Sequence, residues 1–314
     1  MRAALIHQWK SAPASSHVPE VARRPGETLV RIEAATVSHL DVTVASGDFS
    51  VSPCLPYVPG VEGAAVVVES DVFAPGRQVI FRDGPLGLSD HGTWREYASV
   101  PDHVLMPLDV PLSPSVAATF FTPATTAYVA LFDVGGLQAG QTVLVSGATG
   151  AVGSVAVQLA KSAGCDVIAL VSRRSRLERL PDGVQGVALD DEEALSELRE
   201  TRPVDLLVDT IGGEGLSDRI SWMKFGGRVA CLGYTAGTSF SINLPTWFFS
   251  DVAILPVNLL TKGDRAKEVA RELLPQIASG DIKFDIEEFA IEQVAEAWEK
   301  LNSGRVTGRA VIRF

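Results

Sequence analysis

A glycine-rich segment near the middle of the chain has the residue types of a turn that holds a diphosphate. It runs from Ser146 to Gly153 as Ser-Gly-Ala-Thr-Gly-Ala-Val-Gly. Glycine permits a tight turn, close approach of the backbone to phosphate oxygens and close packing of a helix on a strand. Compared with the usual GxGxxG pattern, the first glycine is either shifted to Gly147 or replaced by Ala148. The alternative is that these glycines only close a strand-to-helix turn.

The residues on both sides of this turn predict the elements that would position it. Residues 142–145 form an apolar run typical of a parallel strand buried on both faces. After the turn, Val155, Leu159 and Ala163 recur at helical spacing, and residues 166–171 indicate a second strand. A strand, a glycine-rich turn, a helix and a second strand in this order predict a dinucleotide-binding site.

The segment after the second strand bears on which dinucleotide is bound. About twenty residues beyond the glycines, a site for the unphosphorylated cofactor usually places an acid on the ribose diol. This chain instead has Ser172-Arg173-Arg174-Ser175-Arg176. A hydroxyl and guanidinium groups suit a 2′-phosphate, because guanidinium binds phosphate oxygens in a planar, two-pronged geometry. The pattern favours NADPH, and the alternative is a solvated basic turn that opens a helix.

Length and composition indicate two well-filled domains. A chain of 314 residues is longer than one ordinary core supports, and 46% of its residues are hydrophobic. Its formal net charge of -11 repels nucleic acid and anionic lipid, so neither is expected as a partner. No apolar run is long enough to cross a bilayer and no leader-like segment begins the chain, so we expect a cytoplasmic protein. The three cysteines lack CxxC spacing, which fits a reducing compartment and supplies no zinc-type framework.

The pattern of predicted secondary structure changes twice along the chain. Up to about residue 115 the pattern is short strands and turns, and residues 115–133 indicate helix apart from Pro123. Strands and helices then alternate, which predicts a doubly wound parallel sheet and an α/β fold. From about residue 262 two amphipathic helices lead to a closing strand at residues 308–313, and we expect this tail to rejoin the N-terminal domain. The predicted division is 1–117, 118–260 and 261–314.

Several segments carry a resemblance to a known family over nearly the whole chain. The chain resembles the medium-chain dehydrogenase/reductase superfamily and, within it, the zinc-free quinone oxidoreductase group. This resemblance implies a GroES-like β domain interrupted by a doubly wound, Rossmann-type nucleotide-binding domain. The best-matching segments are Leu55-Pro56-Tyr57-Val58-Pro59-Gly60-Val61-Glu62-Gly63, Thr125-Thr126-Ala127-Tyr128-Val129-Ala130-Leu131, Asp209-Thr210-Ile211-Gly212-Gly213, Gly226-Gly227-Arg228 and Gly308-Arg309.

The chain departs from the zinc-dependent members of this family at the metal site. Their catalytic zinc is held by thiolate, imidazole or carboxylate, whereas the aligned positions here are Ser38, Val61 and Thr122. The hydroxyl that relays the alcohol proton in those enzymes would fall at Leu40. The four-cysteine structural lobe is also missing, so we expect no metal. The neighbouring His39, Asp41 and Glu62 are expected to be structural, the two acids by holding loops in place.

The resemblance also assigns site residues. It implies that Ser38 and Tyr57 donate hydrogen bonds to the substrate oxygen, although the family often has Asn in place of Ser38. It places Thr126 and Val152 against the nicotinamide and Ser172 with Arg173 at the 2′-phosphate. The remaining residues implied at the cofactor are Ala148, Thr149, Gly150, Ala151, Gly153, Ile211, Gly233 and Tyr234. Apart from the glycines and Arg173, each of these residues has a purely structural role as its alternative.

The expected function is an NADPH-dependent, metal-independent reductase that transfers hydride to quinones or other conjugated carbonyl compounds. Such acceptors are already activated by conjugation, so the protein has mainly to position donor and acceptor and to exclude water. One alternative is an enoyl-thioester or 2-alkenal reductase, and another is a catalytically silent NADPH-binding sensor or structural protein. No GxSxG elbow or P-loop lysine occurs, so hydrolase and nucleotide triphosphatase functions have no motif support.

The resemblance further implies a homodimer, formed by pairing of edge strands near residues 252–257. An unpaired apolar edge would otherwise invite aggregation. The preceding aromatics, Trp247-Phe248-Phe249, have two interpretations. They pack a domain or dimer interface, or they wall the mouth of the substrate cleft beside Phe120 and Phe121 and stack on a flat acceptor ring.

Overall fold

A computed structural model describes residues 1–47, 49, 51–81 and 84–314. These residues form two compact units. The first unit combines Met1–Phe121 with Phe284–Phe314, and the second is Thr122–Lys283. Among the described residues, no helix has both the length and the apolar character needed to span a bilayer.

The first unit is built on a seven-stranded sheet in which β14, β15, β3, β4, β5 and β7 follow one another, with β6 paired to β3. A separate two-stranded sheet joins β1 (Arg2–Leu5) to β2 (Ala14–His17). The strands of the large sheet are β3 (Glu27–Val37), β4 (Gly63–Glu69), β5 (Gln78–Phe81), β6 (Tyr97–Pro101), β7 (Leu105–Pro107), β14 (Ile286–Ala290) and β15 (Arg309–Arg313). Its helices are α1 (His39–Ala45), α2 (Pro114–Thr119) and α9 (Val294–Asn302), with 3₁₀ turns at Asp102–Val104 and Ile291–Gln293.

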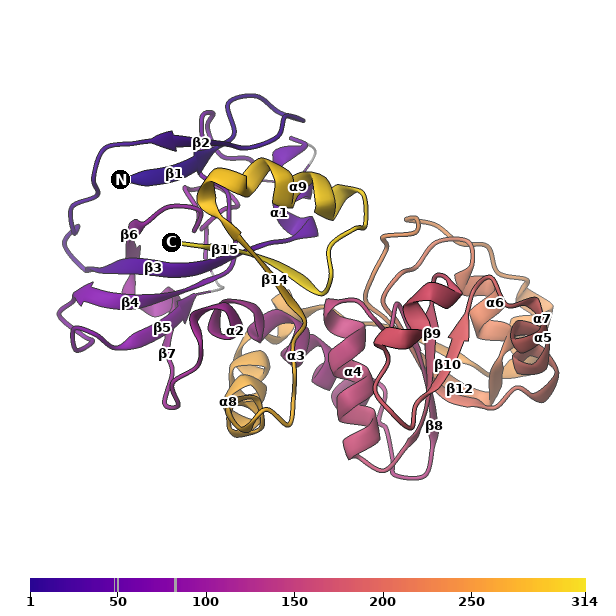
Figure 1. Ribbon diagram of the computed structural model, residues 1–314. Coiled ribbons are helices and arrows are strands. Elements are labelled where there is room, and N and C mark those ends of the chain that lie inside the picture. The colour runs from indigo at the N-terminus through magenta and orange to yellow at the C-terminus, as the bar shows by residue number, and fades with distance from the viewer. Residues whose placement is uncertain (48, 50, 82–83) are drawn as a thin grey trace. The chain divides into compact units, whose positions relative to one another are not determined.

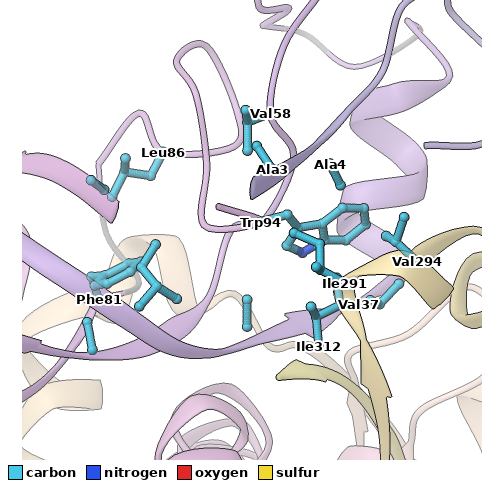
Figure 2. Close-up of a cluster of buried hydrophobic side chains, with 14 of the residues drawn as sticks. Ala3, Ala4, Val37, Val58, Phe81, Leu86, Trp94, Ile291, Val294 and Ile312 are labelled. Atoms are coloured by element: carbon cyan, nitrogen blue, oxygen red, sulfur yellow. The ribbon is translucent and has the colours of Figure 1, made fainter. Parts of the chain in front are cut away.

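The core of the first unit gathers around Trp94. This side chain is fully buried, donates its Nε1 hydrogen to the Thr36 carbonyl at 2.7 Å, and meets Trp298 of α9 edge to face. Figure 2 shows Trp94 among side chains from both ends of the chain, including Ala4 and Ile312. The closing strand β15 therefore completes this core, as predicted, by pairing antiparallel with β3 beside α9 (Figure 1).

The second unit contains a six-stranded parallel sheet in the order β10-β9-β8-β11-β12-β13. The chain works outward from β8 to β10 on one side and from β11 to β13 on the other, which is the doubly wound arrangement of dinucleotide-binding domains. This confirms the predicted fold class. The strands are β8 (Thr142–Ser146), β9 (Asp166–Val171), β10 (Gln185–Ala188), β11 (Val204–Asp209), β12 (Met223–Cys231) and β13 (Ala253–Pro256).

Helices cover both faces of this sheet. Figure 1 shows α4 on one side and α5, α6 and α7 on the other, where their apolar residues join one buried cluster. The helical elements of the second unit, together with the helix that leads into it, are α3 (Phe121–Tyr128), a π-helix (Val129–Val134), α4 (Ala151–Ser162), α5 (Glu192–Thr201), α6 (Leu216–Ser221), α7 (Leu244–Ser250), α8 (Gly263–Ser279) and 3₁₀ turns at Arg174–Arg179 and Leu259–Lys262.

Helix α8 belongs to the second unit, although the sequence places residues 261–314 in the closing part of the first. Arg265 of α8 pairs with Asp133 at 3.0 Å and lies over the ring of Tyr128, both in the helical segment that precedes the sheet. The compact units therefore divide at residues 121/122 and 283/284 rather than at 117/118 and 260/261. The amphipathic pattern of α8 reveals an apolar face but not which core covers that face.

Candidate functional site

The glycine-rich turn leaves bare backbone at the carboxyl end of β8. Gly147 has φ +61°, and a Cβ there would lie 2.4 Å from Thr210 Oγ1. A Cβ on Gly153 would lie 2.3 Å from the Gly147 carbonyl oxygen, so α4 reaches the turn only because residue 153 is glycine. Gly150 is the N-cap of α4 and offers no side-chain cap. The first amides of this 12-residue helix therefore remain available to an anion, and the turn fits a diphosphate.

Two further loops pack backbone against backbone at the carboxyl ends of β11 and β12. A Cβ on Gly233 would lie 1.8 Å from the Thr210 carbonyl oxygen, and one on Gly212 would lie 2.5 Å from the Gly233 carbonyl oxygen. Ile211, which precedes Gly212, is half-buried, and Tyr234 is 64% exposed. Ligands of open parallel sheets bind outside the carboxyl ends of the strands, so Ile211, Gly233 and Tyr234 lie at the edge where a cofactor is expected.

A buried ion pair holds this edge together, and sequence reasoning did not identify it. Asp209 ends β11 with no exposed surface, and its Oδ1 accepts from Arg219 Nε and from Ser146 Oγ, both at 2.8 Å. Its Oδ2 accepts the Gly212 amide at 2.8 Å, while Arg219 Nη2 donates to the Gly212 carbonyl at 2.8 Å. The pair therefore ties β8, β11 and α6 to the glycine loop. An acid at the end of an apolar strand and an arginine ten residues later were the available signals.

The basic segment after β9 is exposed and only partly neutralised. Ser172 and Arg173 are both exposed, and within the described residues the Arg173 side chain has no ion-pair partner. Arg174, in contrast, pairs with Asp191 at 3.2 Å. Burial, then the charges of Arg173 and Arg179, lower the pKa of Arg176, which shows that these guanidinium groups lie close together. An anion placed among them would relieve this repulsion, so the segment fits a phosphate.

The other predicted cofactor residues differ in how far they are buried. Ala148 and Thr149 are buried in the turn, whereas Ala151 and Val152 are half-buried in the first turn of α4. Thr126 lies in α3 with 9% of its surface exposed. In the described part of the chain, no hydrogen bond joins Thr126 to the glycine turn. Its assignment to the nicotinamide therefore still depends on the family resemblance.

The substrate residues predicted in the first unit centre on a buried carboxylate. Ser38 is the N-cap of α1, and its Oγ donates to Asp41 Oδ2 at 2.6 Å. The same oxygen accepts the Ser38 amide at 2.8 Å, and Oδ1 accepts the Val61 amide at 3.0 Å. Asp41 thus links α1 to the loop before β4, which agrees with the expected loop-holding role. Burial raises the pKa of the Asp41 carboxyl to about 6, although these hydrogen bonds act to lower it.

Tyr57 carries a hydroxyl group with no hydrogen-bond partner. Its side chain has no exposed surface, and its hydroxyl is one of the buried polar atoms without a partner among the described residues. Burial, with the nearby charge of Asp41, raises the pKa of Tyr57 above its ordinary value, so the phenol keeps its proton. A buried donor without an acceptor is costly and therefore indicates a missing partner such as a ligand. This fits the predicted hydrogen bond from Tyr57 to a substrate oxygen.

A second ion pair lies close to Asp41. Arg309 of β15 donates to Glu62 at 2.6 Å, and both side chains are largely buried. The charge of Glu62 contributes to the raised pKa of Asp41. Desolvation, and then the charge of Arg309, lower the pKa of His39, which keeps this histidine neutral near pH 7. Glu62 therefore joins the loop before β4 to the closing strand.

The positions that align with zinc ligands hold no metal-binding side chains. The Ser38 hydroxyl donates a hydrogen bond to Asp41, Val61 is buried and aliphatic, and Thr122 is a neutral alcohol. Zinc sites in proteins use thiolate, imidazole and carboxylate ligands. Within the residues the structure describes, no group of three or more His, Cys, Asp or Glu is arranged to hold a metal ion.

The aromatic segment of α7 divides into one packed side chain and two exposed ones. Trp247 packs against the core cluster of the second unit and donates its Nε1 hydrogen to the Val252 carbonyl at 2.7 Å. Phe248 and Phe249 are 68% and 83% exposed. Trp247 therefore packs within the core of its own unit, whereas the sequence predicted these aromatics at an interface or at the mouth of the substrate cleft. Phe120 and Phe121 are buried in the first unit, edge to face with each other.

Comparisons with known proteins agree with this architecture. A family profile described as an alcohol dehydrogenase GroES-like domain matches residues 24–110, and one described as a zinc-binding dehydrogenase matches residues 183–312. The chain is 26% identical to an alcohol dehydrogenase of Geobacillus stearothermophilus, over 100% of this chain and 99% of that protein. It is 27% identical to the human quinone oxidoreductase, over 91% and 88% of the two chains. A solved NAD-dependent alcohol dehydrogenase superposes with TM-score 0.87 at 27% identity, covering 100% of both chains.

The fold and these relatives define an oxidoreductase with a GroES-like domain and a nucleotide-binding domain. Within that class, the chain belongs to the zinc-free quinone oxidoreductase group of the medium-chain dehydrogenase/reductase superfamily.

Proposed function

We propose that this protein is an NADPH-dependent, metal-independent reductase of quinones or other conjugated carbonyl compounds. The observation that carries the proposal is the buried Tyr57 hydroxyl, a donor without an acceptor, in the unit where zinc-dependent relatives hold their metal. A conjugated carbonyl needs hydrogen bonds to its oxygen and correct placement, because conjugation already makes its carbon electrophilic. Tyr57 meets this need without a Lewis acid.

The residues of the second unit fit NADPH. When bound, NADPH supplies a hydride. The turn from Ala148 to Gly153 would hold the diphosphate with backbone amides, and Arg173 with Ser172 would hold the 2′-phosphate. An exposed guanidinium without an acidic partner is suited to a dianionic group, and no acid follows β9 to favour a ribose diol.

Alcohol oxidation has less support, although alcohol dehydrogenases are among the relatives. An alcohol must lose a proton to reach the reactive alkoxide, and zinc-dependent enzymes supply both a Lewis acid and a hydroxyl relay for that purpose. Here Val61 replaces one ligand and Leu40 stands at the relay position. Human quinone oxidoreductase carries the proposed activity in its name, and this supports the reductase direction.

The proposal is tested by turnover of a substrate panel with NADPH and with NADH, in the presence of a strong chelator. We expect reduction of quinones and enones, no oxidation of simple alcohols, and no zinc by elemental analysis. Enoyl-coenzyme A in the same panel distinguishes a thioester reductase. Tight NADPH binding without any turnover would instead identify a sensor or structural protein. One zinc per chain, lost together with activity, would overturn the metal-independent assignment.

A further inference from the structure

We propose that Asp41 is the internal proton source for the reduced substrate, and that Ser38 delivers its proton to the substrate oxygen. This inference rests on the proposed function, because it concerns the proton that must follow the hydride. It adds a chemical role to a carboxylate whose structural role is already evident from its hydrogen bonds to α1 and to the loop before β4.

The hydrogen bonds of Asp41 leave one route for a proton. Within the described residues, its carboxylate accepts from three donors, which are the Ser38 hydroxyl, the Ser38 amide and the Val61 amide. Peptide amides do not release protons in this pH range, whereas a hydroxyl both accepts and donates. The Ser38 hydroxyl, 2.6 Å from Oδ2, is therefore the group through which Asp41 exchanges its proton.

Asp41 and Ser38, the two residues on this proton route, differ in burial. Asp41 has 1% of its surface exposed and Ser38 has 9%. The carboxyl group is thus shielded from water, and Ser38, which carries its hydroxyl partner, is the more exposed of the two residues. A proton held on Asp41 is consequently protected from exchange with solvent until Ser38 passes it on.

The burial of Asp41 and the charges around it allow its carboxyl group to be protonated near neutral pH. The buried Glu62 carboxylate faces Asp41 from the loop before β4, and its repulsion is moderated by the ion pair with Arg309 of β15. His39 on α1 is neutral, and Tyr57 retains its proton. With a pKa of about 6, a fraction of Asp41 on the order of one tenth is protonated at pH 7. The fraction rises as the pH falls.

The proposed step conserves atoms and charge. Hydride addition to a conjugated carbonyl places a pair of electrons and a negative charge on the substrate oxygen, as an enolate or a hydroquinone monoanion. That oxygen takes the proton from Ser38 Oγ while the proton on Asp41 Oδ2 moves to Ser38 Oγ. The product is a neutral enol or hydroquinone, Ser38 is unchanged, and Asp41 is left as a carboxylate. Solvent water reprotonates Asp41 through Ser38 after product release.

Tyr57 is less suited to be this proton source. Transfer of its proton would leave a phenolate in a fully buried site next to the Asp41 charge, which the raised pKa of the phenol opposes. Tyr57 can nevertheless hold the substrate oxygen by a hydrogen bond without giving up its proton. The two hydroxyl groups therefore have separate roles.

The first experiment measures kcat for enone reduction between pH 5 and 8 in wild type, S38A, S38T and T43A. Wild type is expected to lose activity about tenfold per pH unit above the Asp41 pKa and to show a solvent deuterium effect. S38A is expected to be slower, with a flat profile and no such effect, and S38T should restore both features. Thr43 is a half-buried α1 residue whose hydroxyl donates to the His39 carbonyl and not to Asp41, so T43A should keep the wild-type profile.

The second experiment measures the Asp41 carboxyl pKa directly by carbon NMR of labelled protein without cofactor. A value between about 5 and 7 that shifts in S38A supports the proposal. A value near that of an ordinary aspartate, or identical pH profiles in wild type and S38A, would overturn it while leaving the reductase assignment intact. If wild type reduces no quinone or enone at any pH, the proposed function itself fails, and the proton-delivery role fails with it.

Discussion

At the scale of a single residue, we propose that Arg173 determines which nicotinamide cofactor is preferred. It is exposed and follows β9 with no acidic partner among the described residues. A charge-assisted contact with phosphate contributes about 1.5–3 kcal/mol, and about 1.4 kcal/mol is tenfold in affinity. Wild type should therefore bind NADPH at least tenfold tighter than NADH, and R173A should lose most of that preference.

Calorimetric titration of both cofactors tests this expectation. Arg199, an exposed arginine of α5, provides a matched control, because R199A removes the same charge from a different part of the unit. The assignment is refuted by equal affinity of wild type for the two cofactors, or by equal losses in R173A and R199A.

The raised pKa of Asp41 also predicts how stability depends on pH. The folded protein binds this proton more tightly than the unfolded chain, whose aspartate has the ordinary value of 3.8. The stability contributed by protonated Asp41 is therefore fully present below that value and is lost as the pH rises to about 6. About two pKa units correspond to roughly 3 kcal/mol, and the group is almost fully buried.

Urea unfolding at several pH values measures this dependence. From pH 3.5 to pH 7, the free energy of unfolding of wild type should fall relative to that of D41N, whose amide does not titrate. The difference between wild type and T43A should stay constant over the same range. A constant difference between wild type and D41N would mean that the Asp41 pKa is not raised.

At the scale of elements, the Asp209–Arg219 pair fixes the glycine loop between β11 and α6. Removing one partner of a buried ion pair leaves an uncompensated charge and typically costs about 3–5 kcal/mol. D209N should therefore destabilise the protein by that order and weaken NADPH binding, since the amide keeps one acceptor oxygen and cannot accept from both Ser146 and the Gly212 amide. The Lys224–Asp205 pair is about half exposed at the lysine, so K224A should cost below about 1 kcal/mol. Comparable losses in the two variants would show that the buried network has no special role.

At the scale of the whole molecule, the six-stranded sheet ends in a free edge. Strand β13 pairs with β12 on one side only within the described chain, and Phe248 and Phe249 of the preceding α7 are exposed. We therefore propose a homodimer in which two copies of β13 pair. L255K places a charge on this edge strand and should convert the dimer to a monomer by light scattering. V68K, at an exposed valine of β4, should leave the mass unchanged. A wild-type monomer at micromolar concentration would contradict the proposal.

The sequence alone determined the features that depend on neighbouring residues. The glycines from Gly147 to Gly153, the apolar strand before them and the missing acid after β9 are local patterns, because turn conformation and strand burial act over a few positions. The change from strands to helices near residue 115 and the closing strand were also predicted, because they too depend on local patterns.

Only the tertiary structure decided which distant side chains meet. Ser146 and Asp209 lie 63 positions apart, and Glu62 and Arg309 lie 247 apart, so no periodicity in the sequence links them. The assignment of α8 to the second unit and of Trp247 to its core followed from the same kind of contact. The buried Tyr57 hydroxyl without an acceptor is also a property of the folded chain, because every polar group of an unfolded chain is satisfied by water.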